Sequence, residues 1–508
     1  MCAAPGRACP RHPGRQEQGV RRMRRTTDGI RPMSQRLSAL IVNYDSGAFA
    51  RACVESLRAE WRREGQAAER LEIILLDNRS PTDQAEHLAA LEADGVLVMR
   101  EETNHGYGGG MNRALAVSRG EPGDVVAVLN PDTVFLPGSL RPLLRTLALH
   151  PDCGAVGPRT SVDPGGLLEL PPVPLPTARE EAGAAAAHLL PAWARRRGRR
   201  RLTDSLERWT SPHPEDVEML SGCCLLLRRD TLARLERESG HGLFDEDYPL
   251  YYEDADLCAR LRALDLRLVL QGDARIVHHW SRSAGHAERF ARVAGPRLER
   301  SRARWQAQNF TGLGRRLTAR LEQLAGAAAE AGRLPAAHGL VELGELGAAP
   351  ALTWEGNRPW VLEICLSPAF TLAAGSVGQG SSVTLPEEAW EWLFPARYFA
   401  RVTDRKTGRL LGAWTFIKRG VERRLPLALG EYADLAHRRP APGAHRSDSG
   451  LRPEQEPPGV APGQLPAPVS LLAAASPICP PGPNNGHRHA FSHVTAPSPM
   501  PKLTIAPN

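Results

Sequence analysis

The chain has 508 residues, a formal net charge of +7 and a hydrophobic fraction of 42%. At about 100–200 residues per domain, this length predicts two to four structural units with enough apolar residues for a buried core. The mean hydropathy of -0.34 argues against a polytopic membrane protein, and no apolar run reaches the roughly 18 residues of a membrane-spanning helix. The nine cysteines are scattered without zinc-finger or disulfide spacing, which favours a reduced, cytoplasmic chain.

The positive charge permits nucleic acid, anionic lipid or phosphorylated substrates as partners without choosing among them. Because no finger-type Cys/His spacing accompanies it, we expect no nucleic-acid partner. Residues 1–34 are rich in Arg, Gly and Pro and lack the apolar stretch of a secretory signal. We expect a disordered extension there, or translation that starts further along the chain.

The first half of the chain alternates apolar runs with helix-favouring stretches. Strands of buried, parallel-sheet character are predicted at residues 37–43, 71–77, 96–100, 125–129, 218–227 and 266–271. Helices are predicted at residues 49–61, 84–91, 112–118, 140–149, 231–237 and 253–264. The Pro- and Gly-rich residues 158–176 are expected to form a loop, and an Ala-rich helix with an Arg cluster follows at 179–201. This alternation is typical of an α/β domain with a mostly parallel, Rossmann-like sheet.

The second half changes character. An Arg-rich, helix-favouring stretch precedes short apolar runs with several Trp residues and turn signals, and the chain ends in a segment dominated by Pro, Gly, Ser and His. We therefore expect a disordered N-terminal extension, an α/β domain, a helical linker, a small mostly-β accessory module and a disordered tail, at residues 1–34, 35–286, 287–335, 336–425 and 435–508.

Polar side chains end two of the buried strands. Asp77-Asn78 closes the second strand, and Asn130-Pro131-Asp132 follows the fourth. The carboxyl ends of parallel strands are where such sheets bind ligands, and one or two carboxylates suffice for a hard cation that also binds a diphosphate. An Asx turn or helix cap at Asp77, and a type I turn at Pro131, are the plainer alternatives.

A Gly-rich loop runs from Asn104 to Asn112 into a helix, where backbone amides can approach an anion closely. Further on, Glu253, Asp254 and Asp256 open a helix that four aromatic residues precede. Carboxylates in a first helical turn are favoured by the helix dipole alone, but a carboxylate fixed in a partly closed pocket can also serve as a general base. His278 and His279 follow a strand and could complete a metal site begun by Asp132.

In combination these segments resemble family 2 glycosyltransferases of the GT-A fold, in particular the rhamnosyltransferase-like branch that decorates cell-surface glycans. The resemblance covers residues 37–286, about half of the chain. It is carried by Val42-Asn43-Tyr44, Asp77-Asn78-x-Ser80, Asn104-x-Gly106-x-Gly108-Gly109-Gly110-x-Asn112, Asn130-Pro131-Asp132-Thr133, Ser221-Gly222, Phe244-Asp245-Glu246, Tyr252-Glu253-Asp254-x-Asp256-Leu257 and Val277-His278.

The resemblance implies an inverting transfer of one sugar, with rhamnose suggested by the branch, from a dTDP- or UDP-sugar to a glycan or lipid-linked acceptor. It implies Asp254 as general base with Glu253 as its rival, and Mg²⁺ or Mn²⁺ held by Asp132 and His278. Asn130 stands where the family's first metal-site Asp stands. The donor would contact Asn43, Asp77, Asn78, Asn104, Gly106, Gly109, Asn112, Asn130 and Asp132, and the acceptor Tyr252 and Asp256.

Three alternatives remain open. A processive polysaccharide synthase would carry a Gln-x-x-Arg-Trp motif, and Arg304-Trp305 lacks that Gln. A sugar nucleotidyltransferase would need a Lys-containing Gly-rich signature near the first strand, and residues 41–47 hold no Lys. A non-catalytic glycan-binding or scaffold protein could use the module's Trp residues to stack on sugars, although core packing is the more usual role of Trp.

Residues 193–201 begin with Trp193 and contain a cluster of arginines. This cluster could contact anionic lipid. We therefore expect a cytoplasmic enzyme, with peripheral contact at the inner face of the cell membrane as a second hypothesis.

Overall fold

The computed structural model describes residues 35–438, apart from 172, 280–293, 332, 334, 335, 421, 422 and 424. All of these described residues belong to one compact unit. The segments 1–34 and 439–508, which the sequence predicts to be disordered, lie outside them. Within the described ranges, none of the helices has the length and apolar content needed to cross a bilayer.

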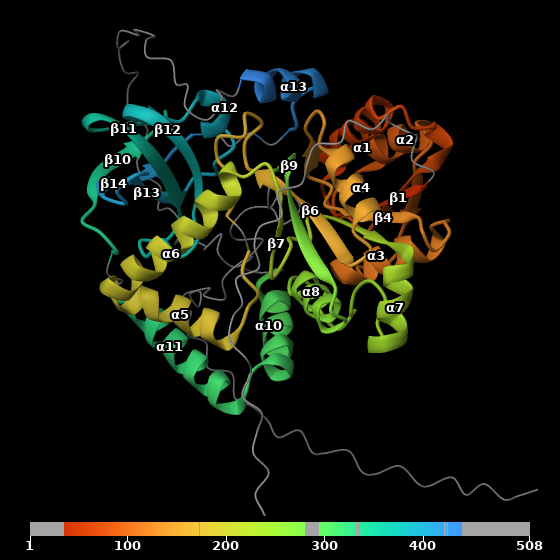
Figure 1. The fold of residues 1–508 in the computed structure, drawn as a ribbon, viewed down its shortest axis with the longest axis horizontal. Helices are drawn as coiled ribbons and strands as arrows, with labels where there is room; N and C mark the ends of the chain where they lie inside the picture. Colours follow the sequence, from red (N-terminus) through yellow and green to blue (C-terminus); the bar gives the residue numbers. More distant parts are fainter. Residues whose placement is uncertain are drawn as a thin grey trace, which may run out of the picture. The chain divides into compact units, whose positions relative to one another are not determined.

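Four parallel strands form the N-terminal part of the large sheet (Figure 1). They are β1 (Leu37–Asn43), β2 (Leu71–Asp77), β3 (Leu97–Arg100) and β4 (Val125–Leu129), in the order β3-β2-β1-β4. Every residue of β1 and β4 is buried, as expected for strands covered on both faces. The predicted bounds of β1, β2 and β4 are confirmed.

The sheet continues beyond β4 with antiparallel and parallel pairs, in the order β8-β6-β9-β5, and β7 pairs with β9. These strands are β5 (Thr133–Phe135), β6 (Cys153–Ser161), β7 (Pro214–Asp216), β8 (Cys224–Arg228) and β9 (Arg267–His278). Two strand predictions were inaccurate here: residues 218–223 are not strand, and β9 runs seven residues past its predicted end. β6 extends into the predicted loop at 158–176, because residues 158–161 pair in parallel with β9.

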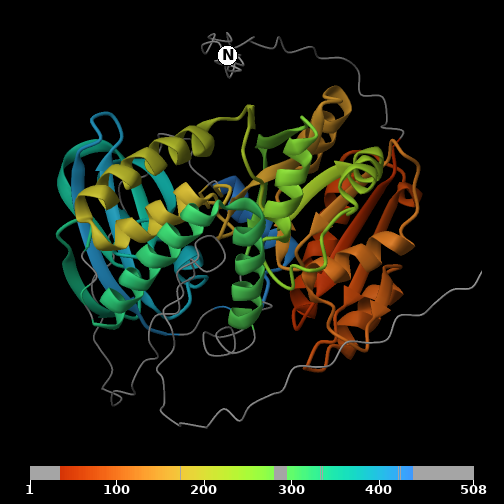
Figure 2. The same ribbon diagram turned by 90° about the horizontal axis from the view of Figure 1, so that it is seen from below.

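Helices connect these strands and lie on both faces of the sheet (Figures 1 and 2). Those of the large-sheet region are α1 (Gly47–Arg63), α2 (Ala85–Ala93), α3 (Gly106–Val117), α4 (Leu140–Leu149), α7 (Arg229–Ser239) and α8 (Glu253–Ala263). α3 begins six residues earlier than predicted, at the glycines themselves. A Cβ on Gly110 would lie 2.9 Å from Val42, so close packing of α3 on β1 explains why weak helix formers are helical here.

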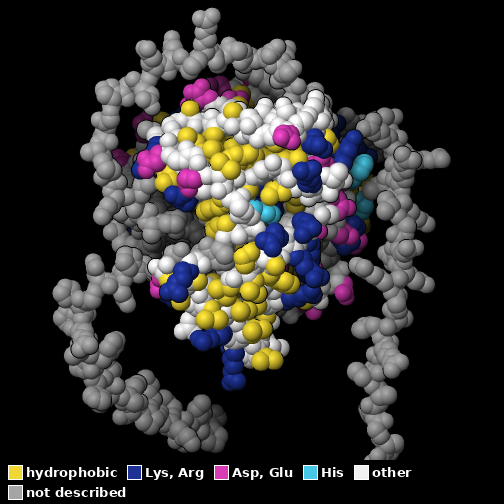
Figure 3. All heavy atoms as spheres, turned by 90° about the vertical axis from the view of Figure 1, so that its left-hand side faces the viewer, with side chains coloured by type: hydrophobic (Ala, Val, Ile, Leu, Met, Phe, Trp, Pro, Cys, Tyr) yellow, Lys and Arg dark blue, Asp and Glu magenta, His cyan; other side chains and the backbone are white. Residues whose placement is uncertain are grey.

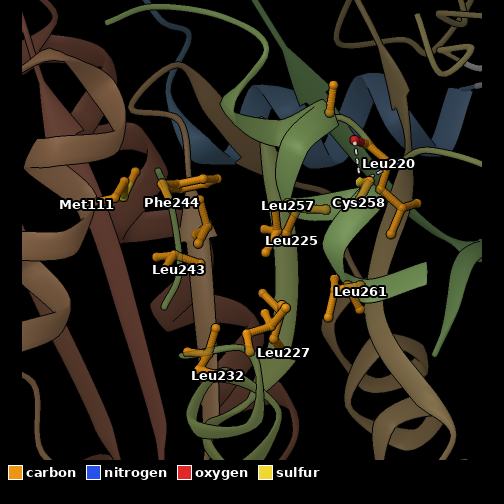
Figure 4. Close-up of a cluster of buried hydrophobic side chains, with 14 of the residues drawn as sticks. Met111, Leu220, Leu225, Leu227, Leu232, Leu243, Phe244, Leu257, Cys258 and Leu261 are labelled. Atoms are coloured by element: carbon orange, nitrogen blue, oxygen red, sulfur yellow. Dashed lines mark hydrogen bonds between the residues drawn. The ribbon is translucent and has the colours of Figure 1, made fainter. Parts of the chain in front are cut away.

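The core beside α8 fixes the helix that carries the acidic motif (Figure 4). Leu257, Cys258 and Leu261 of α8 pack against Leu225 and Leu227 of β8 and belong to one buried apolar cluster. The Cys258 thiol also accepts a hydrogen bond from the Leu220 amide at 3.5 Å. α8 is thus anchored to the sheet along its length. Its first turn, which carries the acidic motif, lies at the edge of the sheet.

The second sheet has five strands in the order β10-β14-β13-β11-β12, which confirms a small, mostly-β module. The elements are β10 (Val341–Leu346), β11 (Ala351–Cys365), β12 (Ala374–Thr384), α12 (Glu387–Trp390), β13 (Arg397–Asp404), β14 (Leu410–Lys418) and α13 (Leu429–Arg438). α13 therefore extends into the segment predicted as tail. The module's tryptophans are core residues: Trp360, Trp390, Trp392 and Trp414 are all buried.

Two helices from the first half of the chain lie over this second sheet, α5 (Ala178–Leu189) and α6 (Pro191–Thr210) (Figures 1 and 2). Trp209 of α6 packs on Val361, and Arg401 of β13 donates to the Gly198 carbonyl at 3.4 Å and to the buried Glu363 carboxylate at 2.6 Å. The linker region contains α10 (Gly295–Asn309) and α11 (Gly312–Glu330), and α11 packs along α5. Residues 178–210 and the module are thus one packed structure.

Candidate active site

The ends of β1 and β2 are joined by side chains. Asn43 donates from Nδ2 to Asp77 Oδ1 at 2.7 Å, and the Ser80 hydroxyl donates to the same oxygen at 2.6 Å. The Ser80 amide donates to Asp77 Oδ2 at 3.2 Å. Asp77 is buried and held in one orientation at the carboxyl edge of the sheet. Asn43 and Asp77, both predicted donor contacts, are therefore neighbours.

Asn78 links this edge to the Gly-rich segment. Its Nδ2 donates to the Gly106 carbonyl at 2.8 Å, and its Oδ1 accepts from the His105 amide at 2.8 Å. Asn104 accepts from the Gly106 amide at 3.0 Å. Gly106 has a φ of +75°, and a Cβ there would lie 2.7 Å from the Pro249 carbonyl oxygen. A glycine is required at this position by both conformation and space.

Gly109 and Asn112 lie on the next turns of α3. A Cβ on Gly109 would lie 3.1 Å from His105 Cβ and 3.5 Å from Glu246 Oε2. Asn112 donates to the Phe244 carbonyl at 2.8 Å and accepts from the Phe244 amide at 3.1 Å. These bonds give Asn112 an anchoring contact with the segment that leads to the acidic helix.

The entry to α8 is built from strained backbone and buried carboxylates. Tyr251 and Tyr252 have φ values of +62° and +68°, a conformation that is uncommon for bulky residues and costly to hold. Asp254 accepts from the Gly222 amide at 3.0 Å and from the Ala255 amide at 2.8 Å. Glu253 is buried, and its Oε2 has no hydrogen-bond partner among the described residues.

The two carboxyls differ in how well their charge is supported. Burial and the neighbouring Asp254 raise the pKa of Glu253 well above its usual value. Burial also raises the pKa of Asp254, but its two backbone amide bonds oppose the shift because they favour the charged form. The two backbone amides therefore favour the charged form of Asp254, a support that Glu253 lacks from its neighbours among the described residues.

Tyr252 and Asp256, the two predicted acceptor contacts, bond to other side chains of the protein. The Tyr252 hydroxyl donates to Glu181 of α5 at 3.2 Å. Asp256 accepts from Arg260 at 2.7 Å, one turn along α8. Arg260 in turn donates to the carbonyl of Leu243 at 2.9 Å, so this pair braces the loop before α8.

Asp132 and His278 are brought together although 146 positions separate them. His278 Nε2 lies 3.3 Å from Asp132 Oδ1 and 3.2 Å from Asn130 Nδ2. The antiparallel pairing of β5 with β9 sets Thr133 opposite His278. Burial alone would lower the pKa of His278, but Asp132 and Cys223 raise it to about 10.

Sequence reasoning missed the residue that joins these groups, Cys223. Burial opposes its ionisation, but the charge of His278, together with hydrogen bonds with His278 and Ser221, lowers the pKa of the thiol below its usual value. Its carbonyl accepts from the Asn130 amide at 2.8 Å. The only sequence signal was its position directly after the Ser221-Gly222 pair.

Tyr107 and Tyr251 also went unpredicted as site residues. Burial raises the pKa of both hydroxyls, and the charges of Glu253 and Asp132 add to each shift. Tyr107 donates to the Gly222 carbonyl at 3.1 Å. Residues 221–223 thus connect the two halves of the site.

Comparison with known proteins agrees with this geometry. The sequence model described as "Glycosyl transferase family 2" matches residues 38–201. The N-acetylglucosaminyl-diphospho-decaprenol L-rhamnosyltransferase of Mycobacterium tuberculosis is 31% identical over 265 residues, which cover 50% of this chain and 79% of that protein. The chain belongs to glycosyl transferase family 2, and it is a glycosyltransferase.

Solved structures show more distant likeness. GalNAc-T7, crystallised with UDP, GalNAc and Mn²⁺, is 16% identical with a TM-score of 0.34, over 51% of this chain and about half, 48%, of that one. The mannosyltransferase PcManGT of Pyrobaculum calidifontis, in complex with GDP-Man and Mn²⁺, is 14% identical with a TM-score of 0.32, over 58% of this chain and 75% of that one.

Gly106→Ala tests how tightly the Gly-rich segment is held. A side chain at positive φ costs about 1–2 kcal/mol, and here the close Pro249 carbonyl adds to that loss. Gly95→Ala is the matched control, because Gly95 has a φ of +79° and nothing within 4 Å of an added Cβ. We expect a clearly lower melting temperature for Gly106→Ala than for Gly95→Ala. Equal melting temperatures would contradict the close contact.

Proposed function

We propose that the enzyme transfers a single sugar, with inversion, from a nucleotide-diphosphate donor to a hydroxyl of a lipid-linked glycan acceptor. One observation carries the proposal: the amide-supported Asp254 and the Asp132–His278 pair adjoin through residues 221–223. The name of the mycobacterial relative supports L-rhamnose as the sugar and a polyprenyl-diphosphate-linked acceptor. The donor would then be a dTDP- or UDP-sugar, and the product a precursor of a cell-surface glycan.

Asp254 acts as the general base in this proposal. Its carboxylate takes the proton of the acceptor hydroxyl while that oxygen forms a bond to the anomeric carbon. The bond from the anomeric carbon to the diphosphate breaks in the same displacement, which inverts the configuration. Glu253, whose pKa is raised by burial and by Asp254, would favour its protonated form and donate a hydrogen bond rather than accept a proton.

The donor site would lie along the carboxyl edge of the large sheet. Asp77, with Asn43 behind it, is held in an orientation suited to accept from the N3–H of a uracil or thymine. Asn78, Asn104, Gly106 and Gly109 form the segment that the diphosphate would approach, and Asn112 fixes that segment against Phe244. Tyr252 and Asp256, through Glu181 and Arg260, would shape the acceptor side.

The donor set at Asp132 and His278 fits Mg²⁺ or Mn²⁺. Such ions prefer oxygen ligands, so the Asp132 carboxylate would be the main protein ligand, His278 would add a nitrogen, and donor phosphates would supply the remaining oxygens. Across the described part of the chain, no three His, Cys, Asp or Glu side chains gather closely enough to hold an ion by themselves. Asp132 and His278 therefore fit a metal ion that arrives already bound to the nucleotide-sugar donor. When bound, it would offset charge on the departing diphosphate.

Residues 35–286 would form the catalytic domain. The helices α5 and α6, which lie within this range, would join the module as an integral second part. The scaffold alternative loses support, because four of the module tryptophans are buried in the core instead of facing a sugar.

Asp254→Asn tests the base. An amide cannot accept the proton, so we expect transfer to fall by at least about a hundredfold while donor binding survives. Glu253→Gln is the control and should retain most of the activity. In the unaltered enzyme, activity should rise with pH through the raised pKa of Asp254, because only the ionised carboxylate can act. Near-normal turnover of Asp254→Asn would remove the assignment.

Metal dependence is tested by removal and return of the ion. We expect EDTA to stop transfer and Mn²⁺ or Mg²⁺ to restore it. A screen of nucleotide sugars for thermal stabilisation with Mn²⁺ should identify the donor, and Asp132→Asn should abolish that stabilisation. Transfer that is indifferent to EDTA would refute the metal role.

We also propose peripheral contact with anionic membrane at the cytoplasmic face. Arg197 and Arg201 pair with Glu180 at 2.5 and 3.6 Å, whereas Arg196, Arg199 and Arg200 are exposed beside Trp193. On α11, Leu313, Leu317 and Leu324 form an exposed stripe at helical spacing flanked by exposed arginines. Figure 3 shows hydrophobic and basic side chains gathered on one face of the molecule. Basic amphipathic helices bind anionic lipid surfaces.

Vesicle binding tests this contact. Each arginine near an anionic surface contributes about 1 kcal/mol, so Arg196→Ser with Arg199→Ser should weaken binding to phosphatidylglycerol vesicles by about thirtyfold. The control pair, Arg405→Ser with Arg409→Ser, removes the same charge from an exposed turn of the module. Equal binding of the two double variants would exclude α6 as the contact.

A further inference from the structure

His279, the residue after His278, is enclosed by aromatic rings from the other half of the chain. Its imidazole stacks on Trp392 with ring centroids 3.8 Å apart and planes 21° apart. Its Nε2 lies 2.7 Å from the Tyr432 hydroxyl, and Phe49 of α1 lies 5.5 Å away on another side. Trp392 and Tyr432, here called the aromatic clamp, are almost fully buried.

The clamped residue is joined to both proposed metal ligands. The His279 amide donates to the Asp132 carbonyl at 3.0 Å, and the preceding residue, His278, reaches the Asp132 carboxylate at 3.3 Å. His279 therefore fixes the backbone at which the two ligand-bearing segments meet.

The clamp comes from the accessory module and the helix after it. Trp392 follows α12, and Tyr432 lies on α13, whose apolar face packs with Ala52, Val134 and Val277 on the large-sheet region. The Tyr432 hydroxyl also accepts from the Leu427 amide at 3.3 Å. These contacts bring residues more than 110 positions later in the chain onto the end of β9.

We propose that Trp392 and Tyr432 are positioning residues of the active site: by holding His279, they set the distance between Asp132 and His278. The module would then act on transfer by completing the site rather than by binding glycan. The inference rests on the proposed metal role of Asp132 and His278. Its physical basis is that partners outside the ligand set orient the ligands they touch.

Trp392→Leu tests the proposal in the full-length chain, because it removes the stacked ring and keeps an apolar side chain. We expect Mn²⁺ binding, measured by thermal stabilisation and by calorimetry in the presence of nucleoside diphosphate, to weaken about ten- to hundredfold. Turnover should fall with little change in the KM for the acceptor. Tyr432→Phe keeps the ring, removes the hydroxyl and should weaken Mn²⁺ binding to a smaller extent.

Trp390→Leu is the matched control. Trp390 is also buried, two residues earlier, but packs inside the module against Phe416 at 5.7 Å. It should lower the melting temperature without weakening Mn²⁺ binding. If both Trp variants change stability and Mn²⁺ binding to the same extent, the clamp is only a packing contact and the proposal is overturned.

Hydrogen exchange separates this proposal from the metal role itself. Faster exchange of the His279 amide in Trp392→Leu, with the Trp390→Leu rate unchanged, supports the clamp even if the unaltered enzyme binds no Mn²⁺. In that case the metal role fails and the positioning of Asp132 and His278 stands. Unchanged exchange in Trp392→Leu overturns the clamp whatever the metal result.

Discussion

The candidate active site depends on the antiparallel pairing of β4 with β8, which continues past Leu129 where the Asn130 amide donates to the Cys223 carbonyl at 2.8 Å. It fastens the end of β4 to residues 221–223, where the chain enters β8. From this turn the Gly222 amide holds Asp254, and the Cys223 thiol bonds with His278. Because β4 is central in the sheet and fully buried, the turn is held rigidly. The positions of α8 and His278 are set by their bonds to this turn.

The site also contains features that lower the stability of the folded protein. Two bulky residues in left-handed conformation precede a buried pair of carboxyls, one of which leaves an oxygen without a hydrogen bond among the described residues. Burial of such groups is unfavourable unless their neighbours compensate. Compensation comes from outside the motif: Glu181 accepts from Tyr252 and from Gln306 of α10, at 3.2 and 2.6 Å. The helices over the module thereby hold the strained turn in place.

The sequence predicted the elements whose stability is local or follows from simple burial. β1, β2 and β4 are continuous apolar runs, and their bounds follow from that pattern alone. The start of α3 and the last half of β9 do not follow from an apolar pattern. Gly106 to Gly110, and residues such as Gly272 and Asp273, favour neither helix nor strand by themselves. Contact with Val42 and pairing with β6 and β5 override those preferences.

The same distinction applies to the site. Motif spacing pointed to Asp132, Asp254 and His278 one by one, and the fold shows how they meet. Trp392 and Tyr432 carry no local signal, because a buried aromatic ring in sequence resembles any other core residue, and Cys223 and Tyr107 were marked only by the motifs beside them. The roles of Tyr107, Trp392 and Tyr432 arise from contacts across more than a hundred positions, and that of Cys223 from contacts with Asn130 and His278. The module illustrates this: its Trp-rich sequence left sugar stacking open beside core packing, and four of its tryptophans are buried, one of them, Trp392, against the ring of His279. A sheet that buries its aromatic side chains in this way has little left with which to stack on a sugar, so the proposed influence of the module on transfer passes through the residues it touches on the large sheet.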